Sequence, residues 1–220
     1  MPVEAAHGPR FAAAGVSKTI GPSTLLAPVD VVAEPGTSLV VRGHNGIGKT
    51  TLLRILAGTL VPTTGSATID DLTADERDPR VRRAVAALIG APTAYRDLTL
   101  ADHLTLVDAT WGGDARTCAA RVAGGLKTLA IGHLAERFPH ELSSGQGQLF
   151  RLALVLFRPS SALVLDEPEQ RLDTDMRRLV ADLLSARRDA GTTVVIASHD
   201  PLLTEAVADE VLDLDTATTR

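Results

Sequence analysis

The sequence predicts an α/β fold with a mostly parallel sheet, an antiparallel β region at its N-terminal side and a helical insertion. Three observations predict it. Short segments broken by glycine and proline fill residues 11–32, the stretch 70–148 is charged and alanine-rich, and apolar strands alternate with amphipathic helices after residue 160. Strands that alternate with helices pair in parallel. We expect one domain over 1–220, with a core from 11–70 and 160–215 and a helical subdomain over about 72–158.

The N-terminal third should begin with an antiparallel β meander over 11–32. Thr37–Arg42 is an apolar run that suits a buried strand, and Thr51–Ala57 has the apolar spacing of a helix that ends at Gly58. The later elements that we expect are helices over 78–88, 99–109, 114–129 and 147–157, a strand over 162–165, a helix over 174–190, a strand over 193–197, a helix from Pro201, and a strand near 211–214.

Composition excludes several classes of protein. Of the 220 residues 45% are hydrophobic and 22% charged, which excludes a disordered chain. The net charge is -5, which disfavours a dedicated nucleic-acid binder. Cys118 is the only cysteine, so no internal disulfide can form. No apolar run approaches the ~18 residues of a membrane span, and Met1–Arg10 lacks the apolar segment of a secretory signal, so we expect the cytoplasm.

A phosphate-binding loop follows the strand Thr37–Arg42. The segment Gly43–Thr50 matches G-x-x-x-x-G-K-[ST], which predicts a P-loop NTPase core. Its glycines let successive N–H groups point at phosphate oxygens, and the next helix adds its positive end. Lys49 should reach the β- and γ-phosphates, and Thr50 should bind Mg²⁺. The residues expected to bind ATP here are Gly43, His44, Asn45, Gly46, Ile47, Gly48, Lys49, Thr50 and Thr51.

Two adjacent carboxylates end the buried strand Ala162–Leu165. Ligands of parallel α/β sheets collect at the carboxyl ends of the strands, so Asp166 and Glu167 should lie beside the phosphate loop. Asp166 is expected to hold Mg²⁺. Glu167 is expected to polarise the attacking water as the general base.

A second anion site is predicted at the start of the helix 147–157. Ser143 and Gln146 have the spacing of a capping box, and small hydroxyl residues with a glycine at a helix start favour anions. Read alone, this segment is no more than a good helix cap.

The order of these motifs resembles the nucleotide-binding subunit of an ABC transporter, from about Phe11 to Leu214. The resemblance implies that Leu142, Ser143, Ser144, Gly145 and Gln146 match the family signature L-S-G-G-Q at four of five positions and bind ATP held by a second subunit. It also implies that His199 contacts the γ-phosphate and that Asp173 belongs to a loop crossing the dimer interface. Ser144 departs from the signature and could weaken closure of the dimer.

Two further departures bear on activity. The family stacks an aromatic residue on adenine, and the matching position here is Ile20, so we expect weaker base recognition. The family also has a glutamine that reaches Mg²⁺ and couples the site to the membrane partner. The matching position here is Gly90 or, with a slip, Ala91. Either water completes the metal shell, or the ATPase is slow, or the site is regulatory.

The resemblance thus implies an ATPase that dimerises around two ATP with Mg²⁺ and drives a separate membrane-spanning subunit, docked through the insertion and the surface around Pro92–Leu104. Its place would be peripheral, at the inner face of the cell membrane. The segment Ile89–Thr99 resembles exporter subunits. The alternative function is a nucleotide-gated dimer clamp, or a regulatory subunit, with little hydrolysis. A P-loop kinase would leave the segment Leu142–Gln146 and His199 unexplained.

Overall fold

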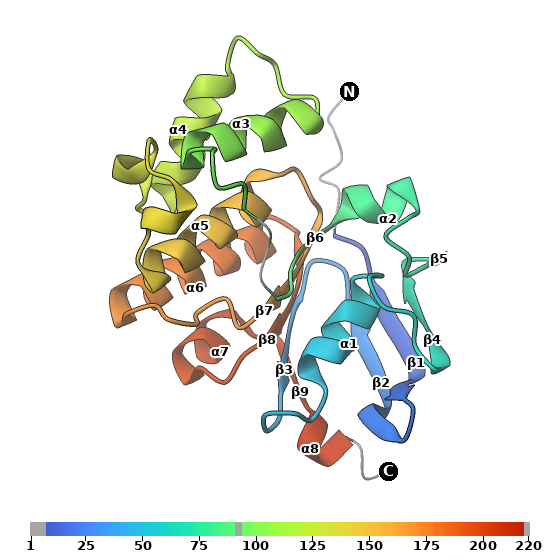
Figure 1. Ribbon diagram of the computed structural model, residues 1–220. Coiled ribbons are helices and arrows are strands. Elements are labelled where there is room, and N and C mark those ends of the chain that lie inside the picture. The colour runs from blue at the N-terminus through green and yellow to red at the C-terminus, as the bar shows by residue number, and fades with distance from the viewer. Residues whose placement is uncertain (1–7, 91–93, 218–220) are drawn as a thin grey trace.

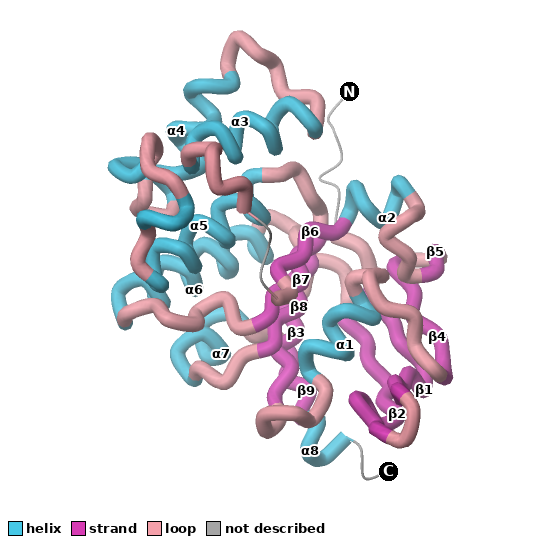
Figure 2. The backbone as a smooth tube through the Cα atoms, in the orientation of Figure 1, coloured by secondary structure: helices cyan, strands magenta, loops and turns pink. Residues whose placement is uncertain are grey.

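The computed structural model describes residues 8–90 and 94–217, which form two sheets with helices between and around them (Figures 1 and 2). The α/β fold with a mostly parallel sheet, an antiparallel part and helices is confirmed. Within residues 8–90 and 94–217, none of the helices combines the length and the apolar composition of a membrane span.

The antiparallel sheet has the strand order β2-β1-β4-β5. Its strands are β1 Phe11–Ile20, β2 Ser23–Ala33, β4 Thr64–Ile69 and β5 Leu72–Thr73. The expected meander of short segments is a hairpin of two long strands, because Gly15 lies at an irregularity of the pairing instead of in a turn. Gly21 and Pro22 form the turn between the two strands.

The parallel sheet has the order β6-β7-β8-β3-β9, and each neighbouring pair is parallel. Its strands are β3 Ser38–Arg42, β6 Val85–Leu88, β7 Ala162–Asp166, β8 Thr193–Ala197 and β9 Glu210–Asp213. Side chains alternate between its faces. In β3, for example, Leu39 and Val41 face the antiparallel sheet, whereas Val40 joins the core on the other side.

Helix α1, Lys49–Leu56, lies between the two sheets (Figure 1). Helices α5 Ser144–Phe157, α6 Thr174–Asp189 and α7 Pro201–Val207 cover the other face of the parallel sheet. The remaining helices are α2 Pro79–Ala84, α3 Leu100–Thr110, α4 Cys118–Thr128, α8 Leu214–Ala217 and the short 3₁₀ helices η1 Gly132–Leu134 and η2 Pro139–Glu141. The carboxyl ends of β3, β7 and β8 therefore lie beside the start of α1.

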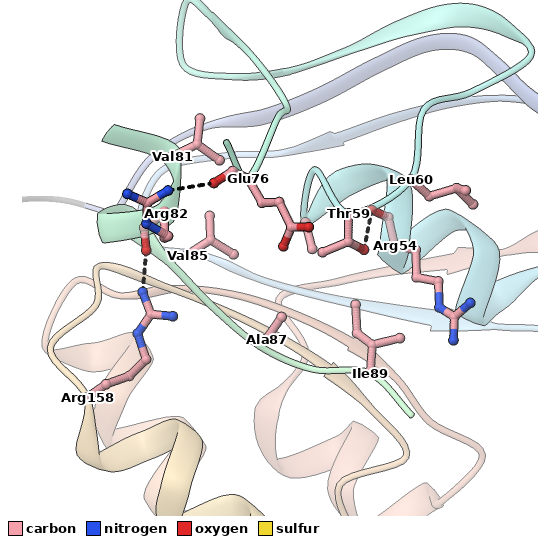
Figure 3. Close-up of a pocket in the computed structure, with 11 residues that line it drawn as sticks. Arg54, Thr59, Leu60, Glu76, Val81, Arg82, Val85, Ala87, Ile89 and Arg158 are labelled. Carbon is pink, nitrogen blue, oxygen red and sulfur yellow. Dashed lines mark hydrogen bonds between the residues drawn. The ribbon is translucent and has the colours of Figure 1, made fainter. Parts of the chain in front are cut away.

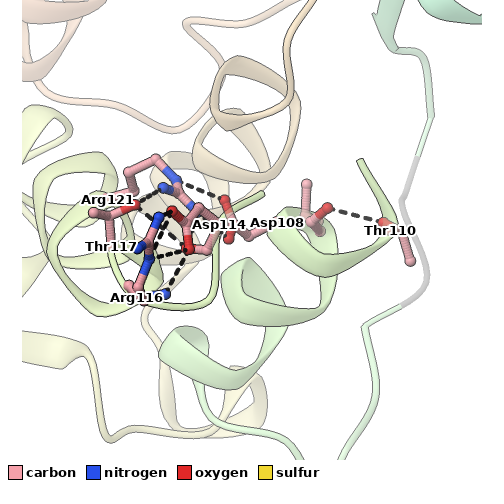
Figure 4. A network of polar contacts seen from close by, with 7 residues as sticks. Asp108, Thr110, Asp114, Arg116, Thr117 and Arg121 are labelled. Carbon is pink, nitrogen blue, oxygen red and sulfur yellow. Dashed lines mark hydrogen bonds and ion pairs between the residues drawn. The ribbon is translucent and has the colours of Figure 1, made fainter. Parts of the chain in front are cut away.

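An ion pair joins the two outer helices α3 and α4. Arg121 Nε donates to Asp108 Oδ1 at 2.9 Å, and Asp108 is 8% exposed (Figure 4). Arg121 also donates to the main-chain oxygen of Asp114 at 2.9 Å, so one guanidinium ties both helices to the loop between them. This network stabilises the helical part of the fold far from the sheets.

One predicted helix is wrong in its second half. The helix expected over 78–88 ends at Ala84, and Val85–Leu88 form β6. The alanines of this segment give no periodicity that separates helix from strand, and parallel pairing with β7 decides the outcome. The division into a core and a helical subdomain over about 72–158 stays a prediction, although β6 lies in the main sheet.

Candidate functional site

The phosphate loop turns on three glycines in the left-handed region. Gly43, Gly46 and Gly48 have φ of 139°, 87° and 113°. A Cβ on Gly48 would lie 2.6 Å from the main-chain oxygen of Leu25, so only glycine fits where β2 approaches the loop. These conformations let the backbone N–H groups converge on one concave surface.

Lys49 folds back over this loop. Its Nζ donates to the main-chain oxygens of Gly43 at 2.8 Å and His44 at 3.2 Å, and the residue is 6% exposed. An ammonium group with three donors can release these carbonyls for phosphate oxygens. Lys49 thus lies at the start of α1 with its ammonium group against the phosphate loop, and its contact with the β- and γ-phosphates stays a prediction.

Thr50 and Asp166 meet across the sheet. Thr50 Oγ1 donates to Asp166 Oδ2 at 2.7 Å. Burial raises the pKa of the Asp166 carboxyl, while the hydrogen bond from Thr50 opposes that rise. A hydroxyl and a carboxylate oxygen form a donor set that suits a hard divalent cation, which would also favour the ionised carboxylate.

Glu167 has an unusual backbone. Its φ is 48°, a conformation that costs an L-residue about 1–2 kcal/mol. Strain of this kind gathers at functional sites. The Glu167 N–H donates to the oxygen of Ala197 at 2.9 Å, which fixes the loop after β7 to the end of β8. The Glu167 carboxylate accepts from Gln170 Nε2 at 2.7 Å.

A cavity of about 460 Å³ brings the phosphate loop and Glu167 together. Its lining residues are Thr24, Leu25, Asn45, Gly46, Gly48, Lys49, Thr50, Thr51 and Glu167. Ile20, the residue expected under adenine, is not among them and is 61% exposed. Thr24 and Leu25, from the facing strand of the hairpin, line the cavity instead.

The second predicted anion segment forms the N-terminus of α5. Ser143 Oγ accepts from the Gln146 N–H at 3.3 Å, and Gln146 Oε1 accepts from the Ser143 N–H at 2.9 Å, which confirms the capping box. A Cβ on Gly145 would lie 3.0 Å from the Arg171 oxygen. The helix starts at Ser144 and not at 147, because the cap is Ser143. None of the residues 142–146 lines the cavity at the phosphate loop.

His199 and Asp173 lie at the ends of elements near the same edge. His199 is exposed and lies two positions after the end of β8. The Asp173 side chain caps α6 by accepting from the Met176 N–H at 2.9 Å. His199 therefore lies after a strand and Asp173 at the start of a helix.

Three residues that contact the site were not predicted from the sequence. Asp215 Oδ1 lies 2.5 Å from His44 Nδ1, and Gln148 Nε2 donates to the oxygens of Glu167 at 3.3 Å and Pro168 at 3.1 Å. Gln170, whose Nε2 donates to Glu167 Oε2, is the third of these residues. Asp215 had no local signal, because it is 171 residues from His44.

The loop after β6 has no side-chain amide at Gly90, the position that matches the family glutamine. Gly90 has φ of 78°, and a Cβ there would lie 3.7 Å from Arg54 Nη2, so space is available but the backbone disfavours other residues. Ala91, the alternative position, and Pro92 lie outside the described residues.

Comparisons with known proteins agree on one family. A family model described as ABC transporter matches residues 26–170. The Fe(3+) ions import ATP-binding protein of Brucella abortus (strain 2308) is 32% identical, over 90% of this chain and 56% of its own length. The glucose import ATP-binding protein of Saccharolobus solfataricus is 34% identical, over 92% of this chain and 59% of its own. The chain thus spans less than two thirds of either relative.

Solved structures match the fold. A dimeric ATP-binding cassette in a post-hydrolysis state with ADP and phosphate has a TM-score of 0.82 at 23% identity, covering 93% of this chain and 94% of the cassette. A dimeric bacterial ABC transporter cassette has a TM-score of 0.82 at 22% identity, with the same coverage.

Proposed function

The chain belongs to the ABC transporter family, and from this premise we propose that it binds and hydrolyses ATP as the nucleotide-binding subunit of a transporter. One observation carries the proposal. Thr50 and Lys49 on the phosphate loop meet Asp166 and Glu167 at the ends of β3 and β7. This is the arrangement that phosphoryl transfer to water requires.

In the proposed reaction, Lys49 exchanges its two carbonyl partners for phosphate oxygens and neutralises their charge. Thr50 and Asp166 would hold Mg²⁺, which supplies charge neutralisation across the phosphates. The chain would thus supply one carboxylate and one hydroxyl to the ion, and oxygens of the substrate and water would supply the other ligands. Glu167 accepts a proton as water attacks the γ-phosphorus, the bond to the β-phosphate oxygen breaks, and ADP leaves.

We further propose that two chains close around two ATP. The capped N-terminus of α5 lies outside the cavity of its own chain, so Ser143–Gln146 are free to bind the phosphates held by a partner's loop. His199 and Asp173 would face that interface. The dimeric cassettes that share this fold support the arrangement.

The membrane partner would dock beside the segment after β6. A groove of about 430 Å³ adjoins it, lined from α1, α2, β6 and the end of α5 (Figure 3). Arg54, Glu76, Arg82 and Arg158 give it polar walls, which suit a polar loop of a membrane-spanning subunit. Such docking would place the chain at the inner face of the cell membrane.

The only evidence on the direction of transport comes from the names of the related proteins. The names of both reported relatives describe import, which favours import here and lends no support to the expected resemblance of Ile89–Thr99 to exporters.

A second candidate, a nucleotide-gated clamp with little turnover, is favoured by Gly90 and by the exposed Ile20. The clamp needs ATP-driven dimers but no hydrolysis.

Steady-state ATP hydrolysis by the wild type and Glu167→Gln, with size exclusion in the presence and absence of ATP, tests both candidates. Glu205→Gln, an exposed carboxylate on α7, is the matched control. The proposal expects turnover in the wild type and the control, and a rate roughly 10²–10⁴-fold lower in Glu167→Gln. Dimers without turnover would support the clamp, and a wild type that is monomeric and inactive with ATP would refute both.

A further inference from the structure

The turn after β7 brings the side chain of Gln170 onto that of Glu167. Glu167 and Arg171 both have positive φ, of 48° and 66°, and the Gln170 N–H donates to the Glu167 oxygen at 3.1 Å. The chain therefore folds back on itself within four residues. As a result, Gln170 Nε2 donates a hydrogen bond to Glu167 Oε2 at 2.7 Å, a distance at the short end of the range for nitrogen donors.

Glu167 lies between two cavities. One is the cavity at the phosphate loop, and the other, of about 230 Å³, is lined by Leu88, Gly90, Gln148, Arg151, Asp166, Glu167 and Gln170. Gly90 contributes no side chain to the second cavity. The amide of Gln148 is committed to the main-chain oxygens of Glu167 and Pro168. Among the described residues that line this second cavity, only Gln170 directs an amide at a carboxylate.

We propose that Gln170 is a positioning residue that orients the Glu167 carboxylate for the attacking water. The inference deepens the proposed function and rests on it. Gln170 holds Oε2, which leaves Oε1 without a hydrogen bond from the described residues and available to a water molecule in the cavity at the phosphate loop. A carboxylate held at one oxygen loses rotational freedom, and this freedom would otherwise oppose proton transfer.

The contact is not needed for the fold. Gln170 is exposed. The hydrogen bond from its side-chain amide to Glu167 is the one side-chain hydrogen bond that the described residues give it. Replacing it by methionine keeps the length of the side chain and removes the donor. Gln170→Met should therefore leave the thermal midpoint, ATP-dependent dimerisation and the KM for ATP unchanged. Its kcat should fall roughly tenfold, the size of effect expected when a general base loses its orientation.

Three further variants sharpen this kinetic test. Gln170→Glu has the same shape but places a second carboxylate against Glu167, so kcat should fall further than in Gln170→Met. In the Glu167→Gln background, Gln170→Met should cause no additional loss, because a residue that acts through Glu167 is not additive with it. Arg178→Met, an exposed substitution on α6, is the control and should leave kcat unchanged.

A nucleotide-free measurement tests the contact itself. The sequence contains three glutamines and one asparagine, so the ¹⁵N spectrum has few side-chain amides, and Gln170→Met identifies that of Gln170 by its disappearance. Glu167→Gln should shift this resonance and leave that of Gln146 in place.

The outcomes separate the two proposals. If wild type and Gln170→Met share the same kcat while Glu167→Gln is inactive, the inference is overturned and the proposed function stands. If the wild type does not hydrolyse ATP, the proposed function fails and the role of Gln170 in water attack fails with it. If the chemical shift of the Gln170 side-chain amide is the same in the wild type and Glu167→Gln, the inference is overturned whatever the rate of ATP hydrolysis.

Discussion

Thr50 Oγ1 donates a hydrogen bond to Asp166 Oδ2 at 2.7 Å, although 116 positions separate the two residues in the sequence. The contact joins the first turn of α1 to the end of β7. It places a hydroxyl and a partly buried carboxylate, whose pKa is raised mainly by burial, side by side at the phosphate loop.

The first prediction concerns this pair. Thr50→Val keeps the shape of the side chain and removes the hydroxyl, so kcat at saturating ATP with Mg²⁺ should fall by roughly a hundredfold if the hydroxyl binds the metal. Thr50→Ser keeps the hydroxyl and should stay within about threefold of the wild type. Measuring both against Mg²⁺ concentration checks the assignment. Equal rates in Thr50→Val and the wild type would remove Thr50 from the metal site.

Much of the site could be predicted because its signals are local. Gly43–Thr50 and the pair Asp166–Glu167 each follow a short apolar strand, and parallel sheets bring such strand ends together. The capping spacing at Ser143 is equally local, and the box forms.

Contacts between distant segments could not be predicted where no motif marks both partners. The His44–Asp215 contact joins the phosphate loop to the C-terminal helix α8, and no spacing rule connects positions 171 apart. Strand β6 is an alanine-rich tetrapeptide whose state is decided by its neighbour β7. The exposure of Ile20 could not be predicted either. The curvature of β1 and β2 decides which of the two strands lines the cavity, and that curvature has no local signal in the sequence.

The second prediction uses two capping boxes of the same kind. Ser143→Ala and Thr99→Ala each remove the hydroxyl that caps a helix, at a cost of about 1 kcal/mol in stability. For a chain of this size, each should lower the thermal midpoint by about 2–4 °C. Ser143→Ala alone should also weaken ATP-dependent dimerisation, measured by size exclusion with Glu167→Gln in the background. Equal loss of dimers in both variants would show that the effect is one of general stability.

The third prediction concerns Glu169, which is 7% exposed, lies two positions after Glu167 in the same loop and contacts Ser198, the neighbour of His199. Its Oε1 accepts a hydrogen bond from Ser198 Oγ, whereas Oε2 is buried with no hydrogen-bond partner among the described residues. Burial raises the pKa of this carboxyl, and the bond from Ser198 opposes the rise.

A raised pKa means that the folded state favours the protonated acid. The stabilisation is complete below the ordinary glutamate pKa of 4.5 and is lost as the pH rises through the folded-state pKa. The free energy of unfolding of the wild type, measured relative to Glu169→Gln by urea denaturation, should therefore decrease as the pH rises from about 4.5 to neutrality. A constant difference over this range would contradict the prediction.

The fourth prediction concerns the tether between the phosphate loop and α8. Asp215 accepts the His44 N–H through Oδ2 at 3.2 Å and lies 2.5 Å from the ring nitrogen through Oδ1. The oxygen of His44 in turn accepts from Lys49 Nζ at 3.2 Å, so the carboxylate supports the loop that holds the lysine.

Asp215→Ala should weaken ATP binding by roughly tenfold, because the loop must then be ordered by the ligand itself. It should leave the kcat at saturation close to that of the wild type. The hydrogen bond from His44 lowers the pKa of Asp215, so this support is present above the ordinary aspartate pKa of 3.8 and is lost only as the pH falls through the lower folded-state pKa. Calorimetric titration with ATP at neutral pH checks the affinity, with the exposed Glu210→Gln on β9 as the control. An affinity that is the same in Asp215→Ala and the wild type would show that the phosphate loop keeps its shape without α8.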